Sequence, residues 1–403
     1  MPDPMLTLAV ILVSGLAALI ASHGVVNTVR HGEWTSAAFL SLGLALMTFS
    51  FLNIVITFAG AWVSTTDVYN TVTNEMPGWG TIGLRVMLVV QALVAVGVII
   101  VRLRRGNQMI NIPAVFLSIV AFISIGSAFL RGEDPLRPFT IIYVLVLLAC
   151  IVAPRGVGIH LGIGVAGLLL AAASCFAMWL HPDIAVDECQ AGYKCGILGF
   201  NLPGVMDNEN ALAISLVMAM PFVYMAFRGW QGTVLTLYVA GVVVLTGSRT
   251  GSLAAVITLA ALLIIRPDVR NPTRAPGRSL LLAIGLIPVL AISVILPFVI
   301  RDPLAFTGRG GLWTLAREEL SSIGALLHGH GVFGWDSLRD IGKIDASEVY
   351  SAHNQWLSVA FSTGLIGLVC FSAAIFALLW QARNSYLPVV CCVLVPVAVL
   401  SIT

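Results

Sequence analysis

Long apolar runs separated by short polar turns make up most of this 403-residue chain. A helix needs about 20 consecutive apolar residues to cross the hydrocarbon core of a bilayer. Twelve runs approach or exceed this length, at residues 5–23, 36–64, 82–101, 109–130, 138–153, 157–180, 209–227, 232–247, 250–265, 279–300, 356–380 and 386–403. The length of the second run predicts a helix that is tilted or extends past the membrane. The pattern predicts an all-α, polytopic integral membrane protein of about twelve transmembrane helices, with one transmembrane domain over residues 1–403.

Composition supports this class of protein. Hydrophobic residues make up 59% of the chain and charged residues 10%, whereas a soluble domain carries about 25% charged residues. The net charge of +2 is too small to indicate nucleic-acid binding, so the bilayer is the expected environment and no nucleic-acid partner is expected. The first apolar run lacks a basic segment before it and is followed by further runs, which favours a mature helix over a signal peptide.

Basic residues indicate the orientation in the membrane. They cluster in alternate turns, at Arg30, Arg102, Arg104, Arg105, Arg155, Arg228, Arg266, Arg270, Arg274, Arg278 and Arg383. Because cytoplasmic loops are enriched in Lys and Arg, we assign these turns to the cytoplasm. The opposite side then receives the loop with Asp67 and Glu75, the loop 181–208, the segment 301–354 and both termini. One miscounted helix near the N-terminus would reverse only the first spans.

The segment 301–354 is predicted to be a large, partly helical extracytoplasmic loop. Its apolar residues recur at spacings of three to four, at Leu312, Ala316, Leu320, Ile323 and Leu327. This period predicts an amphipathic helix over 312–327 whose apolar face lies on the membrane domain or its interface. A glycine-rich turn follows it.

Two cysteines, Cys189 and Cys195, lie in the outer loop 181–208, whereas the other cysteines lie in apolar runs as small core residues. An exported loop is in a compartment that permits disulfides, which favours a bond between them. Two free thiols are the alternative. A metal site is less favoured because His181 is the one other Cys or His nearby.

Arg249 is the first candidate for chemistry. It follows Ser248 in a tight turn between two apolar runs. A guanidinium presents a planar fork of donors that suits phosphate oxygens. The alternative is an arginine that reaches towards lipid headgroups.

Arg309 is the second candidate. It lies among Gly308, Gly310 and Gly311 just before the amphipathic helix. Glycines allow close approach of a ligand to the backbone, and a helix N-terminus adds donors for an anion. The alternative is an exposed loop arginine beside turn glycines.

His353 is the third candidate, and it lies with Asn354 where the polar segment enters an apolar helix. A titratable side chain at a membrane boundary favours a functional role. An imidazole can act as a general base near neutral pH or as a cation facing phosphate. The alternative is an N-terminal cap provided by Ser351 or Asn354, which explains Asn354 better than His353.

Two weaker features remain. Glu209 and Asn210 open an apolar run at the outer face, where acids and amides suit a functional site or a helix cap equally well. His328 and His330 flank one glycine, but two histidines without a third ligand make a poor metal site. We therefore predict no metal.

The ordered segments resemble the O-antigen ligase and polymerase superfamily of bacterial envelope glycosyltransferases, over about residues 195–370. The matching segments are Glu209-Asn210-Ala211-Leu212-Ala213, Ser248-Arg249-Thr250, Gly308-Arg309 with Trp313, Gly329-His330-Gly331, and His353-Asn354 with Gly364 and Gly367. Each motif by itself is unspecific. Their order and their common membrane face carry the resemblance.

The resemblance implies a GT-C-like, metal-independent glycosyltransferase in the bacterial cytoplasmic (inner) membrane, without a cofactor. It implies transfer of a glycan from a polyprenyl diphosphate carrier to a glycan, lipid or protein acceptor on the extracytoplasmic face. Arg249 and Arg309 would bind the diphosphate and His353 would be catalytic. The supporting residues would be Asn354, Ser248, Asn210 and Glu209. Ligase and polymerase are not separated by these motifs.

Two other classes of protein fit the hydropathy. A lipid-linked glycan transporter without chemistry predicts charges along mid-span pathways and repeated broken helices. Among the predicted spans, only Arg85 near the start of the third departs from a nearly charge-free interior. A structural scaffold gives no reason for Arg249, Arg309 and His353 to share one face.

Overall fold

The computed structural model describes residues 3–49, 51–66, 72–105, 110–153, 157–189, 195–271, 276–306, 309–344 and 352–402. Some residues named above lie outside these ranges, and they are Asp67, Arg155, Arg274, Gly308 and Ser351.

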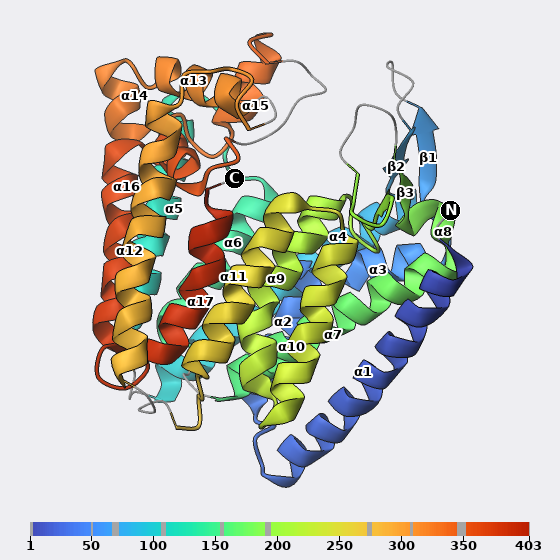
Figure 1. Cartoon of the computed structure of the whole chain (residues 1–403). Coiled ribbons are helices and arrows are strands. Elements are labelled where there is room, and N and C mark those ends of the chain that lie inside the picture. Colours follow the sequence, from blue (N-terminus) through green and yellow to red (C-terminus); the bar gives the residue numbers. More distant parts are fainter. Residues whose placement is uncertain are drawn as a thin grey trace. The chain divides into compact units, whose positions relative to one another are not determined.

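Each predicted apolar run is helical in the described residues (Figure 1). The corresponding helices are α1 (Pro4–Arg30), α2 (Ser36–Phe49) with α3 (Phe51–Phe58), α4 (Gly78–Arg105), α5 (Ile112–Leu130), α6 (Pro138–Val152), α7 (Val157–Leu180), α9 (Glu209–Ala226), α10 (Trp230–Leu245), α11 (Arg249–Ile265), α12 (Pro276–Val299), α16 (Gln355–Ala382) and α17 (Leu387–Leu400). Within the described residues, seven helices are long and apolar enough to cross a membrane, or eight if a bent pair is one span. The shorter apolar helices are α6, α10, α11 and α17. The protein is a polytopic membrane protein, while twelve crossings and a GT-C-like fold stay predictions.

Two features of the fold differ from the expectation. The second apolar run is not one tilted helix, because α2 and α3 are bent by 59°. Two antiparallel strand pairs also interrupt the all-α pattern: β1 (Val63–Thr66) with β2 (Val72–Glu75), and β3 (Asp187–Glu188) with β4 (Phe200–Asn201). The valines and threonines of β1 and β2 favour extended backbone, and both pairs lie in loops between apolar runs.

The contacts divide the chain into two compact units. The first unit comprises Met1–Met87, Pro154–Leu282 and Cys391–Leu400, and the second comprises Leu88–Ala153, Ala283–Val390 and Ser401–Thr403. A single transmembrane domain over the whole chain stays a prediction.

In the first unit, α7 packs closely against α2 and α9 through small residues. A Cβ added at Gly162 would lie 2.4 Å from the Ala38 carbonyl oxygen, and one at Gly164 would lie 2.7 Å from that of Phe222. Small residues allow helix backbones to approach within a membrane, where apolar burial alone gives helices little reason to associate. Helix α9 also contacts α10 and α11, which brings the starts of α9 and α11 close together.

A carboxylate and two arginines join three loops of the first unit that the sequence assigned to the cytoplasm. Arg270 donates to Glu33 over 2.8 Å and to the last carbonyls of α9, Met225 and Ala226, over 3.0 Å each. Arg228 also pairs with Glu33. Burial disfavours the Glu33 carboxylate, but hydrogen bonds from Arg270 and Arg228 outweigh it and lower its pKa to about 2. The shared ion pair agrees with the placement of Arg228 and Arg270 on one side.

In the second unit, α16 is broken by a sharp kink at Gly364. This glycine has φ 63° and ψ −164°, which are not helical angles. The rings of Trp356 and Phe371 lie 5.1 Å apart, whereas a straight helix would separate these positions by about 22 Å. The predicted span 356–380 is therefore two helical pieces, and His353 precedes the short first piece.

The break in α16 is held by the glycine turn after α14 (Ile323–His328). Carbonyls that lose their helical donors at the break accept bonds from this turn: His330 N–H donates to Phe361 over 2.7 Å and Gly331 N–H to Ser362 over 2.9 Å. A Cβ at Gly364 would lie 2.3 Å from the Leu327 carbonyl oxygen. The two glycine motifs of the resemblance therefore pack against each other.

The predicted amphipathic helix 312–327 is wrong as one element. It is divided into α13 (Arg309–Glu319) and α14, because the Ser322 hydroxyl accepts a bond from Ala325 N–H over 3.2 Å and starts a new helix. With α15 (Gly334–Asp340), these helices lie where α12 ends and α16 begins, in orange in Figure 1. Helix α8 (Pro182–Ala185) completes the set of described elements.

Candidate functional site

His353 has a strained backbone that its neighbours hold in place. Its φ is 47°, in the left-handed region that few residues other than glycine occupy, although histidine is enriched there. The Trp313 indole Nε1–H donates to the Ala352 carbonyl over 2.7 Å. Ala352 and Asn354 are 0% and 1% exposed, and His353 between them is half-buried. Strain of this kind costs about 1–3 kcal/mol and is typical of functional sites.

Asn354 fixes the other side of His353 with both ends of its side-chain amide. Its Oδ1 accepts from Leu357 N–H over 2.9 Å, so Asn354 is the N-cap of α16. Its Nδ2 donates to the Ser293 carbonyl over 2.9 Å. Ser293 lies one turn before Pro297 in α12, and proline has no N–H to give that carbonyl. The side chain of Asn354 thus donates the hydrogen bond that Pro297 cannot give to the Ser293 carbonyl.

Arg309 begins α13, whose next turn carries Trp313. Residues four apart share a helix face, so Arg309 lies on the face that reaches Ala352 beside His353. Burial lowers the pKa of the Arg309 guanidinium, which stays charged because arginine titrates far above neutral pH.

The helix N-terminus at Arg309 does not supply free donors in the expected way. Gly310 N–H donates to Ala305 over 3.1 Å and Gly311 N–H to Pro303 over 3.0 Å, so the prediction is wrong for these two groups. A Cβ at Gly310 would lie 1.9 Å from the Asp302 carbonyl oxygen. Gly310 is therefore needed where the backbone passes Asp302, and the Arg309 guanidinium stays the candidate group for an anion.

In the first unit, the candidates at the starts of α9 and α11 are joined by hydrogen bonds. Ser248 is the N-cap of α11: its Oγ accepts from Gly251 N–H over 3.2 Å and donates to Asn210 Oδ1 over 2.8 Å. Asn210 Nδ2 donates to Glu209 Oε1 over 3.3 Å. Arg249 follows Ser248 with its side chain exposed. The cap of α9 is Asn208, which leaves Asn210 to bridge the helices.

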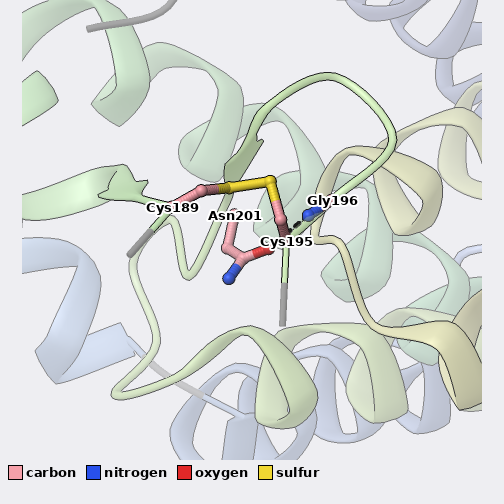
Figure 2. The surroundings of a disulfide bond; sticks show 4 residues. All are labelled: Cys189, Cys195, Gly196 and Asn201. Atoms are coloured by element: carbon pink, nitrogen blue, oxygen red, sulfur yellow. Dashed lines mark hydrogen bonds between the residues drawn. A yellow bond between two sulfur atoms is a disulfide. The ribbon is translucent and has the colours of Figure 1, made fainter. Parts of the chain in front are cut away.

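Cys189 and Cys195 form a disulfide in the same unit (Figure 2). Cys189 directly follows β3, which also places Asp187 near Glu209. Burial, and then the charge of Glu209, raise the pKa of the Asp187 carboxyl.

The described residues contain no cluster of three His, Cys, Asp or Glu that suits a metal ion. The His330 ring stacks on Phe361 with centroids 4.6 Å apart, and its Nε2 lies 3.1 Å from the Glu319 carbonyl. Burial, the largest cause, lowers the pKa of His330. His330 thus has a packing role.

The candidates fall into two groups. Arg309, His353 and Asn354 belong to the second unit, and Arg249, Ser248, Asn210 and Glu209 to the first. Convergence of both groups on one site stays a prediction.

Sequence reasoning missed one partner of these candidates, Ser293, and two residues that hold the backbone near them, Arg317 and Asn201. Pro297 was the available signal for Ser293, because a proline inside a helix leaves the carbonyl four residues before it without a donor. Arg317 donates to the Pro297 carbonyl and, over 2.8 Å, to that of Ile300. No local signal marked Asn201.

These features define a polytopic membrane protein with a histidine held in a strained conformation beside the helix that begins at Arg309. Residues 234–372 match the model of the O-antigen ligase family. The match covers Arg249, Arg309 and His353, and it supports membership of the O-antigen ligase superfamily, so the resemblance is confirmed. No curated protein and no solved structure gives a significant match to the chain.

Proposed function

We propose that the protein is a membrane glycosyltransferase that moves a glycan from a polyprenyl diphosphate carrier to an acceptor hydroxyl on the outer face of the bacterial cytoplasmic membrane. The observation that carries the proposal is the fixed placement of His353. Ala352 and Asn354 on either side are buried and hydrogen-bonded to Trp313 and Ser293. A catalytic group must be held at a defined position relative to the substrate atom with which it reacts. A strained residue whose neighbours fix its backbone is therefore typical of such a group.

The reaction forms a bond between the acceptor oxygen and the anomeric carbon while the bond from that carbon to the diphosphate breaks. As a base, His353 takes the proton of the attacking hydroxyl. Negative charge develops on the departing diphosphate, where a guanidinium stabilises it. Arg309 has this role in the second unit, and Arg249 is assigned the same role on the strength of the Ser-Arg-Thr turn. In the alternative, His353 is itself the cation that stabilises the diphosphate.

A ligase, a polymerase and a protein O-glycosyltransferase of this superfamily share the same donor chemistry and differ in the acceptor. Products formed with lipid A-core, a growing polysaccharide or a protein distinguish them. A non-catalytic transporter of lipid-linked glycan moves the donor across a vesicle membrane without releasing polyprenyl diphosphate. A scaffold does neither.

The test is release of polyprenyl diphosphate from a purified lipid-linked glycan when acceptor is present. His353→Ala is expected to abolish release in a protein that still folds. His328→Ala is the matched control, because the His328 side chain is exposed. Undiminished turnover by His353→Ala would rule out the catalytic assignment. Full activity is expected after exhaustive chelation, and strict dependence on a divalent ion would contradict the metal-independent mechanism.

A further inference from the structure

We propose that the loop closed by Cys189–Cys195 is a positioning element for Arg249, and that reduction of this disulfide weakens binding of the anionic end of the donor. The inference rests on the function proposed above, in which Arg249 binds the diphosphate. It goes beyond that function by assigning roles to Asn201, Gly196 and the disulfide.

The loop is a closed unit. Asp187 and Glu188 pair with Asn201 and Phe200 in the β3–β4 ladder, and the disulfide joins the chain just after β3 to the chain just before β4. The Asn201 side-chain oxygen accepts a bond from Gly196 N–H over 2.9 Å, which crosses the loop in Figure 2. Phe200 is 4% exposed and anchors the second strand.

This loop touches the turn that carries Arg249. A Cβ added at Gly247 would lie 2.2 Å from the Asn201 side-chain oxygen and 3.1 Å from Gly196 Cα. Leu202 N–H donates to the Thr246 carbonyl over 3.4 Å. Gly247 has φ 77°, so both its conformation and the space around it exclude a side chain. The loop therefore packs on the two residues that precede Ser248.

The other side of the turn is held by α9, through the bond of 2.8 Å from Ser248 Oγ to Asn210. Arg249 follows directly, and its side chain is exposed. Packing around the guanidinium therefore does little to fix it, and its position depends on the backbone of residues 246–248. The disulfide loop is one support of that backbone, and α9 is another.

The disulfide matters because it ties Cys195, and with it Gly196, to the residue that follows β3. A dithiol reductant supplies two electrons and two protons, which convert the disulfide to two thiols while the dithiol forms its own disulfide. Without the cross-link, the contacts of Gly196 and Asn201 with Gly247 are expected to be broken for a larger fraction of the time. Donor binding then requires reordering of the turn.

Hydrogen–deuterium exchange of residues 246–251 is measured without substrate, before and after reduction with dithiothreitol, with alkylation and mass spectrometry to establish the thiol state. Exchange is expected to rise on reduction in the natural protein. It is also expected to be high in Cys189→Ser/Cys195→Ser. Cys150→Ser, which removes an exposed thiol of the second unit, is the matched control and should exchange as the natural protein does.

Steady-state kinetics supply the second readout. Loss of the cross-link should raise the donor KM by about tenfold, the effect of one weakened charge-assisted bond, with a smaller change in kcat. Asn201→Ala should act in the same direction, whereas Asn201→Asp retains the acceptor oxygen and should keep exchange low. Equal exchange at 246–251 in oxidised, reduced and Cys-to-Ser proteins would overturn the inference. Because exchange needs no turnover, it decides the inference even in a preparation that lacks transferase activity.

Discussion

The side-chain amide of Asn354 donates to the carbonyl of Ser293, the carbonyl that Pro297 leaves without a helical donor. One proline in α12 thus creates the acceptor that fixes the start of α16 and, with it, the backbone of His353. The Trp313 indole fixes the preceding residue in the same way. A carbonyl in α12 that lacks its helical donor thus helps to determine where His353 lies, just before α16.

Substitution of Asn354 separates its two bonds. Asn354→Asp retains the oxygen that caps Leu357 N–H but loses the donor to Ser293, whereas Asn354→Ala loses both. Asn354→Ala should lower the free energy of unfolding by about 1–2 kcal/mol. Both variants should reduce glycan release, since His353 is no longer fixed. Thermal unfolding and release assays check this, and natural turnover in Asn354→Asp would show that the Ser293 bond is irrelevant to the site.

Substitution of His353 by glycine separates the backbone strain at this position from the chemical role of the imidazole. His353→Gly removes the imidazole but accepts the left-handed backbone without a Cβ penalty, which offsets part of the loss of side-chain contacts. His353→Ala keeps the penalty and should be less stable than His353→Gly by about 1 kcal/mol. Both should lack transferase activity. Thermal unfolding measures both variants, and a glycine variant no more stable than the alanine variant would contradict the strain at this position.

The ion pair of Glu33 predicts a specific pH dependence. Folding lowers the pKa of this carboxyl from 4.5 to about 2, so its stabilising contribution is present above pH 4.5 and is lost as the pH falls towards 2. Glu33→Gln should reduce the free energy of unfolding by about 2 kcal/mol at neutral pH, because two arginines lose a charged acceptor. The difference from the natural protein should shrink in acid.

Thermal unfolding in detergent at about pH 7 and about pH 3.5 measures this difference. Glu318→Gln is the control, because Glu318 is exposed on α13. A deficit for Glu33→Gln that is the same at both pH values would contradict the assigned pKa.

The contact between the two glycine motifs predicts which glycines tolerate a methyl group. Gly364→Ala meets the Leu327 carbonyl oxygen at 2.3 Å, and Gly329→Ala meets Thr363 N at 2.4 Å, and both glycines have positive φ. Each substitution should destabilise the protein by more than about 1 kcal/mol. Gly324→Ala, in α14 with open space around it, should be neutral or stabilising by about 0.5–1 kcal/mol. Melting temperatures of the three variants test the ranking, and a loss in Gly324→Ala equal to the others would contradict it.

The sequence by itself determined the apolar segments and the ordered motifs. Hydropathy is a local property, so each predicted run became helix, and the order of the Ser-Arg-Thr, Gly-Arg and His-Asn segments identified the superfamily that the family match supports. Local pattern also gave the two outer-loop cysteines that form the disulfide. It missed the division of helix 312–327, because a serine that caps a new helix reads like any polar residue on an exposed face.

The tertiary structure decided which backbone groups pair across the chain. The bonds from Ser248 to Asn210 and from Asn354 to Ser293 each join residues far apart in sequence. The kink at Gly364 breaks a helix that hydropathy predicts to be continuous. A proline in a helix, or a break in it, indicates that a nearby carbonyl lacks the backbone N–H that would otherwise donate to it. Only packing decides which distant side chain reaches that carbonyl, because the choice depends on the distances between helices and not on the residues of either helix.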